Sequence, residues 1–457
     1  MIPASTVAVL VLGNHYRERS SSDATMTPVR GGNMTSLQRL SAAVAHTEPD
    51  RVPVDLGATS VSGMHVSVVY RLRQALELDP PGTPVKVINL YQMLGEVALD
   101  LIDALGVDTV CVPGPRSSFG FPNADWKEWI MRDGTPVLVP GQFNTQYESD
   151  GSLLQYPQGD KMVPASGMMP KDGFYFDGIV RQDPIDDDAL NPQDNLEEFG
   201  AISDSDLAHY AREIERLSHT DKAIVAGFGG TGFGDIALVP GLGLKHPKGI
   251  RDVEEWYIST SIRSDYIHEV FAKQCEIGIA NLERIYGVVG DRVFSVMVTG
   301  TDFGTQRGPF ISRETYTHLY APFHRKVTNW VHENTSWKCM IHTCGSVVTL
   351  LPDMIDAGFD IFNPVQCSAE GMDPRVLKER FGNRITFWGG GVNTQHTLPF
   401  GTPREVRSEV ADRIEAFGQG GGFVFNAIHN IQAGTPVENV IAMFDAVKEF
   451  GRNGVRA

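Results

Sequence analysis

The chain has 457 residues, of which 42% are hydrophobic and 21% are charged, and its formal net charge is −17. This composition is typical of a globular enzyme, and the acidic balance disfavours binding to nucleic acid or to anionic membranes. No apolar run has membrane-spanning length, and the five scattered cysteines do not form a disulfide framework, so we expect a cytoplasmic protein.

The first part of the chain lacks the periodicity of helices and strands. Residues 13–33 are polar, and the apolar run at 7–12 follows no basic segment of the kind that opens a signal peptide. We therefore expect residues 1–33 to be a disordered extension. The first predicted helix begins at Thr35, and we expect residues 34–457 to form one catalytic domain.

From Arg51 onward, short apolar runs alternate with amphipathic stretches. The predicted strands are 52–56, 109–113, 223–226, 293–298, 338–342, 361–365, 385–388 and 422–428. The predicted helices are 66–78, 92–105, 203–218, 252–262, 265–286, 313–333, 347–357, 374–381, 403–417 and 437–450. This alternation of strands and helices predicts an α/β fold, a (β/α)8 TIM barrel. An open doubly wound sheet is the alternative, and it would need edge strands of a different pattern.

Residues 115–200 interrupt this alternation. They are rich in Gly, Asp, Pro and aromatic residues, with short alternating runs such as 136–139. The pattern predicts an antiparallel insertion after the second barrel strand. A cover over an active site and an ordinary surface hairpin both fit it.

Metal-binding side chains follow two predicted strands, where a barrel carries its active site. His342 and Cys344 end the fifth strand, and His429 follows the eighth. A catalytic zinc ion needs three protein ligands and one open position. The sequence therefore predicts a zinc site of His342, Cys344 and His429, with Cys367 after the sixth strand as the competing third ligand.

Other polar residues lie at the same predicted end of the barrel. Asp302 follows the fourth strand, where its carboxylate either orients substrate and moves a proton or caps the loop. Asp302 and His429 are the predicted catalytic residues. The predicted substrate contacts are Asp55, Gln306, Gln366 and Asn393.

One glycine pattern does not predict a dinucleotide site. Residues 227–232 match Gly-x-Gly-x-x-Gly after a strand, but further glycines and Pro240 follow where a helix should begin. We interpret this segment as a flexible loop near the mouth of the barrel.

Three segments carry a resemblance to a known family. The runs His342–Gly345, Asn363–Gln366 and Phe387–Gly391 resemble those of the uroporphyrinogen decarboxylase superfamily, and 421–431 with 435–439 fit as well. The resemblance covers roughly residues 34–452, with 115–200 matched poorly, and is closest to the corrinoid-dependent zinc methyltransferases. It implies a (β/α)8 barrel.

The resemblance also implies a chemistry. In this branch a His-x-Cys-Gly segment supplies two zinc ligands, and a cysteine before a Thr-Pro-x-Glu-Asn helix start supplies the third. Counting back from Thr435 places His429 where that cysteine would be. A His₂Cys set is less electron-rich than HisCys₂. The substrate group that zinc binds can therefore be a hydroxyl, phenolate or ether oxygen as readily as a thiol.

The implied cofactors are zinc and a corrinoid (cobalamin) on a separate partner protein, since the chain has no Asp-x-His-x-x-Gly run of its own. The implied reaction is O-demethylation of a small methoxylated substrate, with thiol methylation as the second choice. Relatives often form dimers, so a homodimer is compatible with the resemblance.

Porphyrinogen decarboxylation is not expected. The decarboxylase carries an Arg-Gln-Ala-Gly-Arg segment near its start, whereas residues 54–60 here contain no arginine. Two rival functions stay open: a metal-independent decarboxylase or lyase that uses His429 and Asp302 as acid and base, and a ligand-binding barrel without catalysis.

Overall fold

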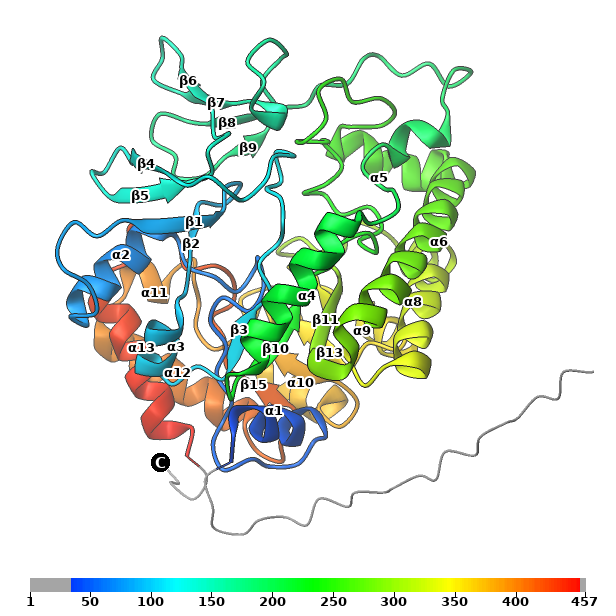
Figure 1. Cartoon of the computed structure of the whole chain (residues 1–457). Coiled ribbons are helices and arrows are strands. Elements are labelled where there is room, and N and C mark those ends of the chain that lie inside the picture. The colour runs from blue at the N-terminus through cyan, green and yellow to red at the C-terminus, as the bar shows by residue number, and fades with distance from the viewer. Residues whose placement is uncertain (1–33, 453–457) are drawn as a thin grey trace, which may run out of the picture. The chain divides into compact units, whose positions relative to one another are not determined.

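A parallel seven-stranded sheet forms the centre of the computed structural model, which describes residues 34–452. The predicted extension, residues 1–33, lies outside the described residues. The strands follow the order β15-β14-β13-β12-β11-β10-β3, so that chain neighbours are also sheet neighbours (Figure 1). They are β3 (Thr109–Cys111), β10 (Ala223–Ala226), β11 (Ser295–Thr299), β12 (Lys338–His342), β13 (Ile361–Asn363), β14 (Thr386–Trp388) and β15 (Phe423–Val424).

Backbone hydrogen bonds from residues 53–55 join the two edges of this sheet. On one side, Asp55 N donates to Phe425 O, and Phe425 N donates to Pro53 O, both at 2.8 Å. On the other side, Asp108 N donates to Val54 O at 2.8 Å, directly before β3. The first predicted strand is thus a short bridging segment. Because the edges of an open sheet lie far apart, the doubly wound alternative is excluded.

Helices follow the strands and cover the outside of the curled sheet (Figure 1). They are α1 (Ser36–Val44), α2 (Val66–Ala75), α3 (Leu99–Leu105), α4 (Asp204–Ser218), α5 (Val253–Ile262), α6 (Ser264–Val289), α7 (Arg313–Thr315), α8 (Ala321–Asn334), α9 (Leu351–Asp356), α10 (Pro374–Phe381), α11 (Thr397–Phe400), α12 (Pro403–Phe417) and α13 (Val437–Phe450). A π-helical turn, Tyr316–Tyr320, separates α7 from α8.

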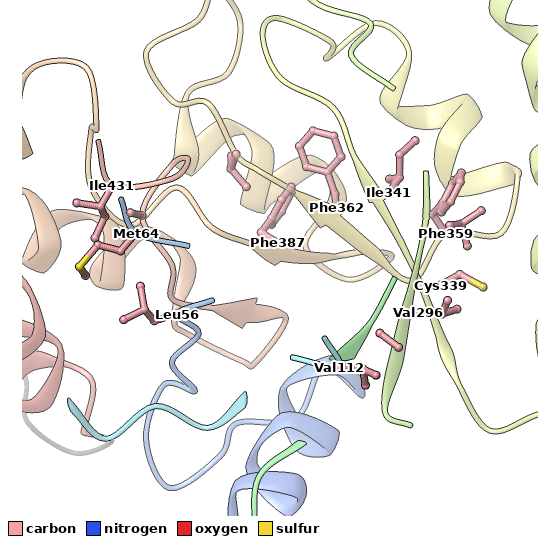
Figure 2. Packing of buried hydrophobic residues seen from close by; sticks show 14 of the residues in the cluster. Leu56, Met64, Val112, Val296, Cys339, Ile341, Phe359, Phe362, Phe387 and Ile431 are labelled. Carbon is pink, nitrogen blue, oxygen red and sulfur yellow. The ribbon is translucent and has the colours of Figure 1, made fainter. Parts of the chain in front are cut away.

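Alternate residues of β10, β12, β13, β14 and β15 belong to two different hydrophobic clusters. Ile341, Phe362 and Phe387 face the helices, and the rings of Phe362 and Phe387 meet edge to face on neighbouring strands (Figure 2). Met340 and Ile361 belong to the second cluster, inside the barrel. This two-sided burial explains why the strands appear in the sequence as continuous apolar runs.

The strands between β3 and α4 take part in two small sheets, and only one of them is the local antiparallel sheet that the sequence predicts. β6 (Thr145–Tyr147), β7 (Leu153–Gln155), β8 (Gly167–Met169) and β9 (Asp177–Gly178) form an antiparallel sheet. A second sheet, of order β2-β1-β5-β4, also takes in strands from before β3. It combines β1 (Val85–Asn89) and β2 (Leu94–Gly95) with β4 (Lys127–Ile130) and β5 (Pro136–Val139), and β1 pairs with β5 in parallel.

The predicted helix 92–105 is therefore wrong in its first half. Residues 94–95 form β2, and α3 begins only at Leu99. The reason is tertiary: Gly95 N donates to Met64 O and Glu96 N to Lys86 O, so pairing with distant backbone replaces helical bonds. Within residues 34–452, no helix has both the length and the apolar character needed to cross a membrane.

Candidate metal centre

The structure brings the three predicted zinc ligands together. The possible ligand atoms of His342, Cys344 and His429 all lie within 4.8 Å of one another. Cys344 Sγ is 3.6 Å from His342 Nε2, and the two imidazole rings are 5.7 Å apart between centroids. Cys367 is not in this group, and its Sγ lies 3.4 Å from Val365 O.

Each ligand is positioned by the end of a strand. His342 is the last residue of β12, on the inward face that it shares with Met340. His429 lies in the loop after β15, between two anchored neighbours. Ile428 N donates to Val392 O at 3.1 Å, and Asn430 Oδ1 accepts from Gly63 N at 2.6 Å.

A buried amide fixes the orientation of the His342 ring. Asn363 Nδ2 donates to Trp388 O at 2.8 Å, so its Oδ1 must be the atom that lies 2.7 Å from His342 Nδ1. Nδ1 therefore carries the proton, and the lone pair of Nε2 points to Cys344 and is available to a metal ion. This arrangement, in which one ring nitrogen donates and the other faces the metal, is typical of metal-binding histidines.

Asp302 lies beside the three ligands. Its Oδ1 accepts from Cys344 N at 2.6 Å and is 3.8 Å from His342 Nε2, and its side chain is 24% exposed. The backbone carbonyl of Asp302 accepts a hydrogen bond from the hydroxyl of Tyr257. The carboxylate thus both holds the loop that carries Cys344 and faces the metal centre.

Burial shifts the pKa values of Cys344 and His429 toward their neutral forms. Burial, together with the nearby Asp302 carboxylate, raises the pKa of the Cys344 thiol well above its usual range. Burial and the neighbouring His342 lower the pKa of His429 to about 3. Burial also raises the pKa of Asp235 to about 6, with a contribution from the charge of Asp302. A thiolate at Cys344 therefore needs a bound cation for charge compensation.

Two glycines bring the loops after β11 and β12 into direct backbone contact. Gly345 has φ +85°, and a Cβ on it would collide with the carbonyl group of Gly304. A Cβ on Gly304 would come within 2.6 Å of Cys344 O. Ser346 N also donates to Thr305 O at 2.7 Å, so the two loops are held as a pair.

The four predicted substrate residues lie in different environments. Gln366 Oε1 accepts from Gly345 N at 2.8 Å, beside the metal centre. Gln306 is exposed, and Asn393 Oδ1 accepts from Gln395 N at 2.8 Å within its own loop.

Asp55 is 1% exposed, and both of its carboxylate oxygens have partners inside the barrel. Oδ1 accepts from Thr109 Oγ1, and Oδ2 accepts from Trp388 Nε1, each at 2.8 Å. This carboxylate connects three strand ends rather than facing open space.

Asn363, Asp235 and Tyr257 were not assigned roles from the sequence. Asn363 ends β13 directly beside His342, which ends the neighbouring strand β12. This strand-end position is the one feature of the sequence that could have marked Asn363 as a site residue. Asp235 and Tyr257 meet Asp302 only through loop folding, and no local pattern marks them.

A second group of possible ligands lies at the other end of β12. It consists of His332, Cys339 and Asp360. Its geometry is that of a hydrogen-bonded group, because His332 Nε2 lies 2.8 Å from Asp360 Oδ2, which also accepts from Cys339 N. The N-terminal ends of barrel strands usually serve stability rather than catalysis.

Comparisons with known proteins place part of this chain in a sequence family. A family model described as uroporphyrinogen decarboxylase (URO-D) matches residues 296–450, which contain all three candidate ligands. Proteins named uroporphyrinogen decarboxylase from Coxiella burnetii and Psychromonas ingrahamii are 33% and 37% identical over 88 residues. Each match covers 18% of this chain and 24% of the relative, so it spans about a quarter of these relatives.

A solved structure extends the likeness in fold to most of the chain. A methyltransferase from Methanosarcina mazei covers 91% of this chain and 99% of its own, with a TM-score of 0.51 and 16% sequence identity. At this identity the likeness concerns the fold alone. The resemblance inferred from the sequence motifs is therefore confirmed over residues 296–450, which match the uroporphyrinogen decarboxylase family model, and the fold resembles that of the methyltransferase from Methanosarcina mazei.

Proposed function

We propose that this protein is a zinc-dependent methyltransferase of the uroporphyrinogen decarboxylase-like type. It transfers a methyl group between a small methoxylated substrate and a corrinoid carried by a separate partner protein. The observation that carries the proposal is the convergence of His342, Cys344 and His429 within 4.8 Å, from loops more than eighty positions apart in the chain.

The donor set fits zinc. One thiol and two neutral imidazoles are preferred zinc ligands, and three protein ligands leave a fourth position for substrate. When bound, zinc would polarise the substrate oxygen or sulfur and lower its pKa. The hydrogen bond from His342 Nδ1 to Asn363 keeps Nε2 ready for the metal, and Gln366 holds the backbone next to Cys344.

Asp302 is the proposed catalytic carboxylate. Its carboxylate accepts a hydrogen bond from Cys344 N and so holds the loop that carries this candidate ligand. Its side chain is partly exposed and lies close to His342, where it can hold a proton at the substrate oxygen that loses its methyl group. The proposed reaction is O-demethylation, because with a His₂Cys set a substrate oxygen is as good a candidate as a coenzyme thiol. The corrinoid protein and a second copy of the chain are the proposed partners.

The metal-independent lyase is the weaker candidate. It requires His429 to donate a proton near neutral pH, whereas burial lowers the pKa of His429 to about 3 and keeps the ring neutral. A neutral imidazole is the form that binds zinc.

Metal content and methyl transfer test this proposal. Tag-free protein should contain about one zinc per chain and should demethylate a methoxylated phenol with free cob(I)alamin as the acceptor. Cys344→Ala should lose both the zinc and the activity, because two ligands do not hold the ion tightly.

Cys339→Ala is the matched control, since Cys339 is a buried thiol on β12, the strand that ends two residues before Cys344, and belongs to the second ligand group. It should keep the zinc. Full zinc in Cys344→Ala, or loss of zinc only in Cys339→Ala, contradicts the assigned site. Activity without stoichiometric zinc favours the lyase.

A further inference from the structure

Asp302 lies beyond the end of β11. The strand ends at Thr299, after an irregularity in its pairing with β12. Further along, side chains take over as backbone partners, because Phe303 N donates to Thr343 Oγ1 at 2.8 Å and Cys344 N donates to the carboxylate of Asp302 at 2.6 Å. The position of Asp302 therefore depends on individual side-chain contacts and not on the sheet.

One of these contacts comes from α5. The hydroxyl of Tyr257, on this helix, donates to the backbone carbonyl oxygen of Asp302. The preceding residue, Trp256, is 3% exposed, and its ring lies 6.1 Å from that of Phe271 on α6. Because this buried tryptophan anchors α5, the neighbouring tyrosine has a fixed place from which it can hold Asp302.

A second aromatic ring holds the tyrosine. Phe310 stacks on Tyr257, with the ring centroids 4.9 Å apart and an interplanar angle of 17°. Phe310 N donates to Phe303 O at 2.7 Å, so this ring belongs to the same loop as Asp302. Stacked aromatic pairs stabilise a structure beyond the area that they bury. The loop after β11 is thus joined to α5 by a hydrogen bond and by a stacked ring pair.

The hydroxyl of Tyr257 remains a donor. Burial raises the pKa of Tyr257 far above its ordinary value, and the neighbouring Tyr320, Asp302 and Asp235 add to the shift. The hydrogen bond goes to the backbone of Asp302, so it leaves the carboxylate free to accept from Cys344 N. Tyr257 therefore fixes the place of the residue, and Cys344 N fixes the direction of its carboxylate.

We propose that Tyr257 is a positioning residue of the metal centre. Its hydroxyl holds the backbone of Asp302 so that the carboxylate stays at Cys344 N, beside His342, and the ring of Phe310 keeps the hydroxyl in place. The inference rests on the proposed function, in which Asp302 is the catalytic carboxylate. It deepens that function by adding a residue that acts through Asp302 without touching the substrate.

An ordinary buried tyrosine is the alternative. Tyrosine hydroxyls usually find a hydrogen-bond partner when they are buried, whether or not a reaction needs them. Tyr266 on α6 is such a case, since its hydroxyl donates to Asn195 Oδ1 at 2.7 Å. Under this alternative, loss of the Tyr257 hydroxyl would lower stability without a specific effect on Asp302. Kinetics and hydrogen exchange separate the two roles.

Methyl transfer by the full, zinc-loaded chain is the first measurement, with a methoxylated phenol as donor and free cob(I)alamin as acceptor. Tyr257→Phe keeps the stacked ring and removes only the hydroxyl. It should lower kcat by about 10- to 100-fold, with KM and zinc content close to the wild type, because a displaced catalytic group slows the reaction more than it weakens binding. Tyr266→Phe is the matched control and should keep the wild-type kcat. A wild-type kcat in Tyr257→Phe overturns the proposal.

A double-mutant cycle tests whether Tyr257 acts through Asp302. Asp302→Asn keeps an oxygen that can accept from Cys344 N but removes the carboxylate. Since Tyr257 acts by placing that carboxylate, Tyr257→Phe should change kcat by less than about two-fold when it is added to Asp302→Asn. An equal fold-loss in the two backgrounds shows an effect independent of Asp302 and overturns the proposal.

Hydrogen exchange gives a readout that does not need the reaction. The amide of Cys344 donates to Asp302 Oδ1, so its exchange in the full chain reports whether the carboxylate is in place. Tyr257→Phe should speed exchange of the segment 343–345 by about 3- to 10-fold, as expected when one hydrogen bond is weakened, and Tyr266→Phe should not. Unchanged exchange of this segment in Tyr257→Phe, or an equal acceleration across the whole domain, overturns the proposal.

The outcomes separate this inference from the function on which it rests. Absence of methyl transfer by the wild type, together with faster exchange at 343–345 in Tyr257→Phe, refutes the function and leaves the placement of Asp302 by Tyr257 standing. Methyl transfer by the wild type, with unchanged kcat and exchange in Tyr257→Phe, refutes the positioning role alone.

Discussion

Asn363 is a side chain outside the candidate ligand set that positions one of the candidate ligands, His342. Its amide is 1% exposed and has both ends occupied, by His342 Nδ1 and by Trp388 O. Because the two contacts belong to neighbouring strands, the amide sets the ring orientation and ties β12 to β14 across β13. Residues that orient a metal-binding histidine commonly affect metal affinity 10- to 100-fold.

Asn363→Leu should therefore weaken zinc binding by about 10- to 100-fold while the fold persists. The leucine removes the acceptor of His342 Nδ1, so the ring loses its fixed orientation. Competition with a chromophoric chelator measures the affinity. Asn439→Leu is the control, since Asn439 is an equally buried amide that bonds Leu398 O and Gly401 O. Equal loss of zinc affinity in both variants would show a general loss of stability instead.

At this scale the sequence predicted the three candidate ligands that the structure brings together and missed the residues that arrange them. His342, Cys344 and His429 stand out because imidazole and thiol groups follow apolar strands. The role of Asn363 depends on contacts that its amide makes with the neighbouring strands. The role of Asp235 depends on a loop that folds back so that its carboxyl group interacts with Asp302. Cross-strand contacts of this kind leave no local pattern.

At the scale of elements, two of the three helices predicted with the observed bounds have capping signals in the sequence. Helices α10, α12 and α13 have the predicted bounds, 374–381, 403–417 and 437–450, and the first two begin with side-chain caps. Asp373 caps α10, and Thr402 with Glu405 forms a capping box before α12, where Pro403 occupies the first turn. The strands β1 and β2 had no such signal, because their pairing depends on distant backbone.

Thr402→Ala should lower the free energy of unfolding by about 0.5–2 kcal/mol. The change removes the oxygen that accepts from Glu405 N at 3.3 Å and the hydroxyl that donates to Glu405 Oε2. Thr402→Ser, which keeps the oxygen, should stay close to the wild type. Urea denaturation provides the measurement, and equal loss in the two variants would contradict the capping role.

At the scale of the whole molecule, buried histidines couple folding to pH. Burial lowers the pKa of His324 and His429 to about 3 and of His65 to about 4, from 6.5. Between pH ~6.5 and ~4 the unfolded chain binds protons that the folded chain excludes, so the free energy of unfolding falls as pH falls. Asp235, whose pKa is raised to about 6, acts in the opposite direction, as do Asp55 and Glu198, whose pKa values burial also raises.

His324→Phe should weaken this pH dependence by about one proton between pH ~6.5 and ~4. The ring is fully buried among Phe233, Phe303 and Phe359, and Nε2 has no hydrogen-bond partner within the described residues. Denaturation of metal-free protein at several pH values measures the slope. His396→Phe, at an exposed site, should keep the wild-type slope. An unchanged slope in His324→Phe would show that other groups set the acid sensitivity.

The backbone contact between Gly304 and Gly345 has a consequence for engineering. Each loop occupies the space that a side chain on the other loop would need, so the backbone conformation of one depends on that of the other. Grafting a foreign loop after β11 without its counterpart after β12 would displace the carboxylate from the ligand loop that it holds. New specificity in this barrel is therefore better sought by exchanging both loops as one cassette.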